Sequence, residues 1–129
     1  MKRTLITLGM VSLLLAAFAC ERRGDGGPAA DAGGVIKVGI YGDLSGQTSS
    51  FGESTRNGVM MAIDEINAAG GIGGRKVEAV IEDDQGQPQQ ASTVVSKLIN
   101  QDKVVAILGE VASTNTLAAA PKAQEARIP

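Results

Sequence analysis

Short apolar runs alternate along this chain with longer segments of helical periodicity, and this alternation restricts the possible folds more than any other feature. The runs are VIKVGIY at residues 35–41, KVEAVIEDD at 76–84 and VVAILG at 104–109. They are rich in β-branched residues and short enough to be strands. VVAILG is apolar throughout, which is typical of a parallel strand covered on both faces. Strands that alternate with helices predict an α/β domain with a doubly wound parallel sheet.

The segments that follow the three runs are expected to be helices. The first covers residues 52–69 and stops at the glycines of 70–74; the second starts with Pro88 in its first turn. The third covers residues 114–126, where Pro121 would bend or split it. The expected apolar faces comprise Val59, Ala62, Ile63 and Ile66 in the first helix and Ala91, Val94, Val95, Leu98 and Ile99 in the second.

The start of the chain has the features of an export signal. A basic start, MKR, precedes an apolar run of about 14 residues, which is shorter than the roughly 20 that span a bilayer. The small residues of Ala17-Phe18-Ala19 predict cleavage just before Cys20, so residues 1–19 are expected to be a signal peptide.

Cys20 is the only cysteine, so the chain cannot form an internal disulfide, and the position of this residue is the informative feature. A cysteine at the first mature residue resembles a bacterial lipoprotein, in which the thiol is diacylated after export. Ordinary secretion and a single transmembrane anchor are the alternatives. Residues 20–34 are rich in Gly, Ala and Pro and are expected to form a flexible tether, while residues 35–129 form the folded part.

The composition argues against several classes of function. The chain has no histidine, which removes Ser-His-Asp catalysis and most zinc sites. Aromatic residues make up 2% of the chain and the net charge is −2 with no basic stripe, so neither single-stranded nor duplex nucleic acid is an expected partner. No metal, cofactor or catalytic residue is expected.

A nucleotide-binding enzyme is a weaker alternative. The acidic stretch Glu82–Asp84 at the end of the second strand could hold a ribose. The G-x-G-x-x-G pattern that should open the first helix is missing, however, because Gly39, Gly42 and Gly46 have other spacings.

A binding site is expected at the carboxyl ends of the strands, where open α/β sheets bind their ligands. With the strand order 2-1-3, the loops at residues 42–52 and 109–116 would flank one crevice. A helix starting near Ser113 would direct free N–H groups into it and favour an anion, to which the Ser113 hydroxyl could also donate. Ser113 and Thr114 are equally typical N-cap residues, and a cap and an anion ligand can share this place.

Residues 35–129 resemble the N-terminal lobe of the leucine/isoleucine/valine-binding proteins, which are type I periplasmic substrate-binding proteins of ABC transporters. The matching stretches are IKVGIYGDLSG, FGESTRNGVMMAIDEINAAGGIGGRKVEAVIEDDQGQP and VVAILGEVASTNTLAAAPKAQEARIP. The resemblance implies a two-lobed protein that closes on an amino acid and delivers it to a membrane permease, without catalysis. It also implies that the sequence is the first part of a longer, exported, periplasmic protein, with Ile128 and Pro129 opening a fourth strand.

The resemblance assigns roles to individual residues. Ser113 and the backbone N–H groups of Thr114 and Asn115 would hold the α-carboxylate of the ligand. Phe51 would form an apolar wall of the pocket, and Gly109 would let the backbone come close. The expected ligand-binding residues are Ser50, Phe51, Ala112, Ser113, Thr114 and Asn115.

Two positions depart from the family pattern. A disulfide that some members have between the loops after the second and third strands is absent, because Gly86 and Ala112 stand there. Glu110 stands where a neutral residue or histidine is common, which leaves its role and the identity of the ligand open. The same lobe can also serve as the sensor domain of a signalling receptor, which is the alternative to transport.

Overall fold

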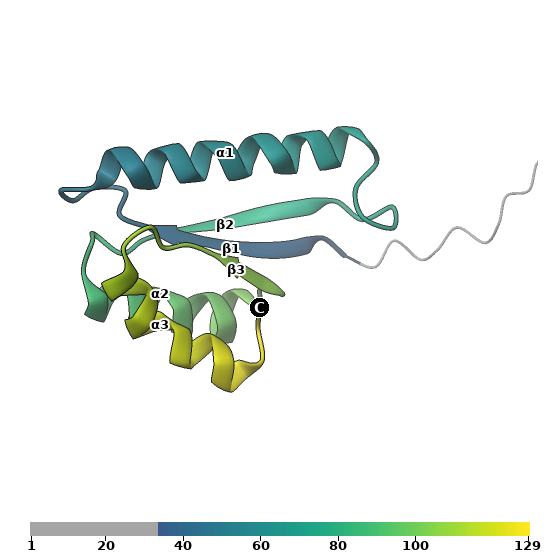
Figure 1. The fold of residues 1–129 in the computed structure, drawn as a ribbon. Helices are drawn as coiled ribbons and strands as arrows, with labels where there is room; N and C mark the ends of the chain where they lie inside the picture. The colour runs from purple at the N-terminus through teal and green to yellow at the C-terminus, as the bar shows by residue number, and fades with distance from the viewer. Residues whose placement is uncertain (1–33) are drawn as a thin grey trace, which may run out of the picture.

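The computed structural model describes residues 34–129 (Figure 1). The expected signal peptide, Cys20 and the tether up to residue 33 lie outside the described residues. The elements are β1 (Ile36–Gly42), α1 (Ser49–Ala68), β2 (Val77–Asp83), α2 (Pro88–Lys97), a π-helical turn η1 (Leu98–Asp102), β3 (Ala106–Leu108) and α3 (Ser113–Ala126).

The strands form one parallel sheet in the order β2-β1-β3. β1 pairs along its whole length with β2, from Ile36 opposite Val77 to Gly42 opposite Asp83. On its other side it pairs with the three residues of β3. The α/β class, the parallel sheet and the 2-1-3 order are therefore confirmed.

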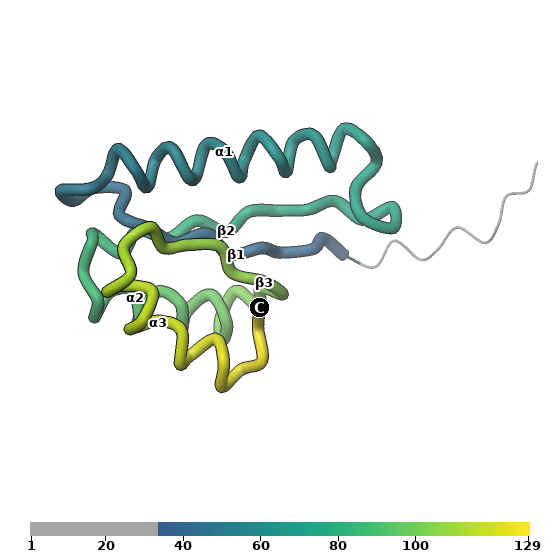
Figure 2. The backbone as a smooth tube through the Cα atoms, in the orientation of Figure 1, coloured from purple at the N-terminus to yellow at the C-terminus, as the bar shows by residue number. Residues whose placement is uncertain are grey.

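Helices cover the sheet on both sides. α1 lies along one face, whereas α2 and α3 lie side by side on the other (Figure 1). The tube in Figure 2 shows the three helices starting at the same end of the sheet, the end at which the strands finish. This is the arrangement expected of a chain that repeats strand and helix in turn.

The main core lies between the sheet and the α2–α3 layer. It consists of Tyr41, Ala91, Val94, Val95, Leu98, Val104 and Ala119. Four of the five apolar residues predicted for the face of the second helix are buried, and Ile99 packs at the margin. Pro88 is the first residue of α2, as predicted, because a proline there needs no hydrogen-bonded N–H.

The opposite side of the sheet is less enclosed. Ile63 is the only buried residue of the apolar face predicted for α1, whereas Ala62 and Ile66 are exposed. α1 lies over β1 and β2. Val105 and Leu108, at either end of β3, are 52% and 43% exposed as a result. The expectation that the third strand is covered on both faces is wrong for the described residues.

Several boundaries differ from those expected. α1 begins at Ser49, three residues before the predicted start at residue 52, so Ser50 and Phe51 belong to its first turn. α3 begins at Ser113 and runs without interruption through Pro121. The Ile107 N–H donates to the Pro129 carbonyl at 2.8 Å, so the last residue lies beside the outer edge of β3.

The end of α1 is attached to the start of β2 by one side chain. Asn67 Nδ2 donates to the Val77 carbonyl and Asn67 Oδ1 accepts from the Val77 N–H, both at 2.8 Å. The amide group thereby pairs with the backbone as a neighbouring strand would. Of the helices between residues 34 and 129, none is both long and apolar enough to cross a membrane.

Candidate ligand-binding site

An open hollow of about 580 Å³ lies at the carboxyl ends of the strands. Its walls are the loop after β1, the loop after β2 and the start of α3. Of the six expected ligand-binding residues, Ala112, Thr114 and Asn115 line this hollow. A hollow therefore occurs where the strand order reverses, at the place predicted for a ligand.

The other three expected residues lie outside the lining. Ser113 is exposed at the start of α3, and Ser50 is exposed in the first turn of α1. Phe51 is 61% exposed, so residues 34–129 leave most of its surface uncovered. For Phe51 to form the expected apolar wall of a pocket, a part of the protein outside residues 34–129 would have to pack over it.

The start of α3 shows which backbone donors are available. Ala112 is the N-cap residue, and no side chain of the N-cap makes a capping bond. The N–H groups of Asn115 and Thr116 both donate to the Ala112 carbonyl at 3.1 Å. The N–H groups of Ser113 and Thr114 have no acceptor among the described residues.

These contacts change two expectations. Ser113 is the first helical residue, so neither it nor Thr114 caps the helix, and the capping alternative is wrong. The Asn115 N–H, expected to bind a ligand, is already bonded, and the Ser113 N–H is free in its place. Two free N–H groups at the positive end of a helix can bind a carboxylate.

Asp43 organises the loop after β1, although the sequence analysis did not single it out. The side chain is 1% exposed and accepts from the Gly46 N–H at 2.5 Å and from the Thr48 N–H and hydroxyl at 2.8 and 2.6 Å. The hydrogen bond from the Thr48 hydroxyl lowers the pKa of Asp43 most, and the backbone N–H groups add to it against the effect of burial. An aspartate followed by Ser, Gly and Thr is a usual sequence for such a turn, and was the available signal.

Asp83 connects the loops after β1 and β2. It accepts from the Leu44 N–H at 2.9 Å, the Ser45 hydroxyl at 2.5 Å and the Gln85 N–H at 2.8 Å. Burial opposes its ionisation, but these hydrogen bonds outweigh burial and lower the pKa of Asp83. Its neighbour Glu82 forms an ion pair with Lys97. Two of the three carboxylates considered for a ribose, those of Glu82 and Asp83, are thus engaged within the protein.

Asp84 is the least satisfied carboxyl group near the hollow. It is fully buried, and Oδ1 accepts from the Gly86 N–H at 2.9 Å while Oδ2 has no partner among the described residues. Burial raises the pKa of Asp84, and the negative charges of Glu110, Asp43 and Asp83 raise it further. Asp84 therefore holds its proton to a higher pH in the folded state than in the unfolded state.

We expect the substitution Asp84→Asn to change the pH dependence of stability. The pKa of Asp84 is raised in the folded state. Its contribution to the free energy of unfolding is therefore fully present below the ordinary pKa of 3.8 and is lost as the pH rises through the folded pKa. The difference in free energy of unfolding between Asp84→Asn and wild type should therefore grow in favour of the variant as the pH rises. Urea denaturation between about pH 3 and 8 measures this difference.

Asp43 should show the opposite sign, because its folded pKa is lowered. Its contribution is present above 3.8 and is lost as the pH falls through the folded value, so Asp43→Asn should lose most stability near neutral pH. Asp64→Asn, on the exposed side of α1, is the matched control and should give a flat difference. A flat difference for Asp84→Asn as well would contradict the prediction.

Glu110 joins the loops after β1 and β3. Its Oε1 accepts from the Asp43 N–H at 3.4 Å and its Oε2 from the Ala112 N–H. The Thr116 hydroxyl donates to the Glu110 carbonyl at 3.0 Å. The residue whose role the sequence left open is therefore attached to both walls of the hollow.

Gly109 is required by a close contact within the protein. Its φ is +136°, and a Cβ there would lie 2.1 Å from the Tyr41 carbonyl oxygen. The close approach expected at Gly109 is thus present, but it is an approach to β1. No side chain fits between the two strands at this point.

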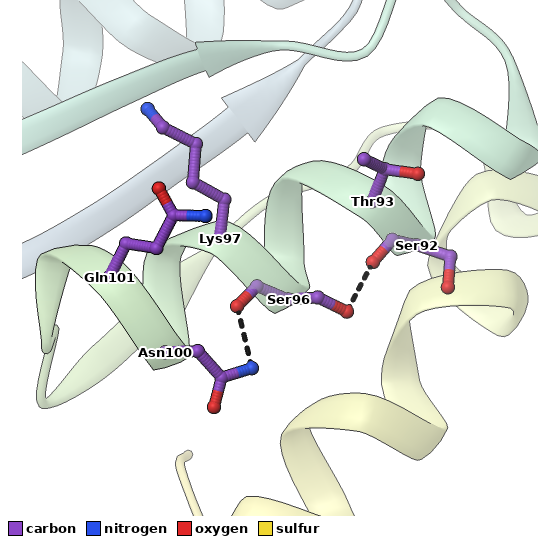
Figure 3. Close-up of a pocket in the computed structure, with 6 residues that line it drawn as sticks. All are labelled: Ser92, Thr93, Ser96, Lys97, Asn100 and Gln101. Carbon is purple, nitrogen blue, oxygen red and sulfur yellow. Dashed lines mark hydrogen bonds between the residues drawn. The ribbon is translucent and has the colours of Figure 1, made fainter.

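A second hollow, of about 470 Å³, lies along α2 and η1 (Figure 3). Ser92, Ser96 and Asn100 line it, with Thr93, Lys97 and Gln101. The Ser96 hydroxyl donates to the Ser92 carbonyl at 2.8 Å and Asn100 Nδ2 to the Ser96 carbonyl at 2.9 Å. Figure 3 shows these side chains spread along one helical stretch, so they do not converge on a ligand. Within residues 34–129, no group of three or more His, Cys, Asp or Glu side chains could hold a metal ion.

Comparison with known proteins identifies the family. Residues 35–129 match the sequence model of the periplasmic binding protein family. The chain is a periplasmic binding protein. The recognition of this family from the sequence is confirmed, and the end of the sheet that carries the hollow is the binding edge expected for it.

Similar periplasmic binding proteins are known from several bacteria. The chain is 40% identical over 93 residues to an amino acid binding protein of Pseudomonas aeruginosa, covering 72% of this chain and 25% of that protein. It is 39% identical over 106 residues to a leucine-, isoleucine-, valine-, threonine- and alanine-binding protein of the same species, covering 82% and 27%.

A solved structure supports the same relationship. The branched-chain amino acid transporter substrate-binding protein of Streptococcus pneumoniae, in complex with isoleucine, has a TM-score of 0.72 and 38% identity to this chain. The match covers 74% of this chain and 27% of that protein. This periplasmic binding protein sequence therefore spans about a quarter of the length of its relatives.

Proposed function

We propose that the protein is the substrate-binding component of an ABC importer for amino acids, and that residues 35–129 form part of its N-terminal lobe. The observation that carries the proposal is the pair of free N–H groups of Ser113 and Thr114 beside the hollow. They occur in a chain that is similar to proteins named for binding branched-chain amino acids.

The start of α3 has the chemistry needed to hold a carboxylate. The N–H groups of Ser113 and Thr114 and the positive helix end would stabilise the negative charge, and the Ser113 hydroxyl would add a third donor. Hydrogen bonds to a charged acceptor are shorter and stronger than neutral ones. Phe51 would supply apolar surface once the second lobe closes over it. The site binds and releases its ligand unchanged, so we propose no enzymatic activity.

The proposal includes a location and a partner. A protein of this kind works outside the cytoplasmic membrane and passes its ligand to a membrane permease. We propose that the export signal at residues 1–19 directs it there and that lipid on Cys20 anchors it. Metabolic labelling with a radioactive or clickable fatty acid tests the anchor, because Cys20→Ser should abolish incorporation.

A thermal-shift screen of the complete protein against the twenty amino acids tests the function. A ligand present at 100 times its Kd stabilises the folded state by about 2.7 kcal/mol, which is a readily measured rise in Tm. We expect such a rise with at least one neutral amino acid. The absence of a shift with all twenty would overturn the proposal.

Ser113→Ala is expected to weaken amino acid binding by about 1.5–3 kcal/mol, because one hydrogen bond to a charged group is lost. Titration calorimetry of the complete protein with leucine measures the change. Ser54→Ala is the matched control, since the Ser54 hydroxyl donates to the Ser50 carbonyl on the exposed side of α1. Equal affinity of Ser113→Ala and wild type would remove the Ser113 hydroxyl from the site.

A further inference from the structure

The carboxylate of Glu110 is held in one place. One oxygen accepts from the Asp43 N–H at 3.4 Å, and the other accepts from the Ala112 N–H. An ionised carboxylate only accepts hydrogen bonds, and both of its oxygens face donors here. The two donors come from different loops, so the fold determines where the negative charge of Glu110 lies.

This charge lies beside the donors proposed to hold a ligand. Ala112 directly precedes Ser113, and both Asp43 and Ala112 line the hollow. The lining residues also include no lysine and no arginine. No basic side chain in the lining of the hollow therefore offsets the charge of Glu110 or of the neighbouring carboxyl groups of Asp43, Asp83 and Asp84.

We propose that Glu110 determines specificity: it fixes the start of α3 against the loop after β1, and its charge selects against ligands that carry a net negative charge. The inference rests on the proposed function and names the ligand class of that same site. A zwitterionic ligand brings a cationic group with its carboxylate and is tolerated. An acidic amino acid or a dicarboxylate brings a second negative charge into a space that already holds fixed ones and is rejected.

Glu110 is the carboxylate that acts on the positive end of α3, because it is bonded directly to the N-cap residue of that helix. The free N–H groups of Ser113 and Thr114 attract any anion, including one that should be excluded. A fixed carboxylate bonded to the Ala112 N–H reduces this attraction at its source. One carboxyl group of a ligand can still bind by direct hydrogen bonds, whereas further negative charge gains nothing.

The test compares two ligands in the complete protein by displacement of radiolabelled leucine with unlabelled leucine or glutamate. In Glu110→Gln the amide oxygen still accepts one N–H bond while the charge is gone. We expect glutamate to gain at least tenfold relative to leucine in this variant. Any loss of structure should weaken both ligands alike, so the ratio reports the charge.

Two further variants separate charge from structure. Glu110→Asp keeps the charge, and its leucine-to-glutamate ratio should stay within about threefold of wild type even if both affinities fall. Glu125→Gln removes one negative charge from the last turn of α3, about 18 Å from the start of that helix. This variant should leave the leucine-to-glutamate ratio unchanged.

A salt series on the wild type gives a readout that needs no variant. Raising the ionic strength from about 0.02 to 0.5 M shortens the screening length several-fold and should improve glutamate relative to leucine. A ratio that stays the same in Glu110→Gln and across the salt series overturns the inference. That result would leave the proposed function intact, which fails instead if wild type binds no amino acid.

Discussion

Leu98→Ala is expected to lower the free energy of unfolding by about 2–5 kcal/mol, a large effect for the truncation of one side chain. Leu98 is fully buried where α2 passes into η1, between the sheet and the α2–α3 layer. Its methyl groups fill the space left by Gly39 of β1, where a Cβ would lie 2.9 Å from Leu98 Cδ1. Truncation would leave a cavity that this packing cannot close, because β1 and η1 are both held by hydrogen-bonded structure.

Urea denaturation followed by circular dichroism measures the effect. Leu117→Ala is the matched control, because Leu117 is a leucine of α3 that is 73% exposed. The control should change the free energy of unfolding by less than about 0.5 kcal/mol. Similar effects of the two substitutions would place the core elsewhere than between the sheet and α2.

Gly52→Ala is expected to destabilise the protein by about 1–3 kcal/mol, against the usual preference of a helix for alanine. Gly52 lies in the first turns of α1, and a Cβ there would be 1.9 Å from the Asp43 carbonyl oxygen. Either the backbone of α1 or that of the loop after β1 must move. Since the side chain of Asp43 holds the loop after β1, the same movement should disturb the hollow.

Gly58→Ala on the same helix is the control and should have the opposite sign. A Cβ at Gly58 meets no atom within 4 Å, so the substitution should stabilise the protein by about 0.5–1 kcal/mol through helix propensity alone. Both variants are compared by urea denaturation, and Gly52→Ala also by titration with leucine. Stabilisation by Gly52→Ala would show that α1 and the Asp43 loop are not in contact.

The hollow is formed by loops that hold one another. Asp43 holds its own loop, Asp83 attaches that loop to the end of β2, and Glu110 attaches it to the start of α3. These carboxylates accept mainly backbone N–H groups, so their effect is to order the chain at the carboxyl edge of the sheet. Ordered walls reduce the entropy that a ligand must overcome on binding.

The order of strands and helices could be predicted from local pattern alone. Strand-like runs and the apolar face of α2 have distinct periods, and Pro88 marks the start of that helix. The position of the site at the strand ends followed from the 2-1-3 order, which the structure confirms. The family could be recognised for the same reason, since its matching stretches are contiguous in the sequence.

Contacts between distant residues could not be predicted in this way. Glu110 and Asp43 are 67 positions apart, and no spacing in the sequence indicates that one accepts from the other. The exposed face of β3 depends on α1 lying over β1 and β2, which local periodicity does not specify. The capping expected of Ser113 was wrong because the helix begins one residue earlier than a Ser113 cap requires. The N–H groups of Asn115 and Thr116, which such a cap would accept from, donate to the Ala112 carbonyl instead.

The sequence by itself therefore determined the fold class, the family and the edge of the sheet at which a ligand is expected. Each depends on residues that are neighbours in the chain or share a helical or strand period. Tertiary structure alone decided which N–H groups stay free, which carboxylates are engaged and where Glu110 places its charge. These features depend on how loops that are remote in sequence meet. A hydrogen bond forms only when donor and acceptor lie within a few ångströms of each other, and folding alone brings these groups that close.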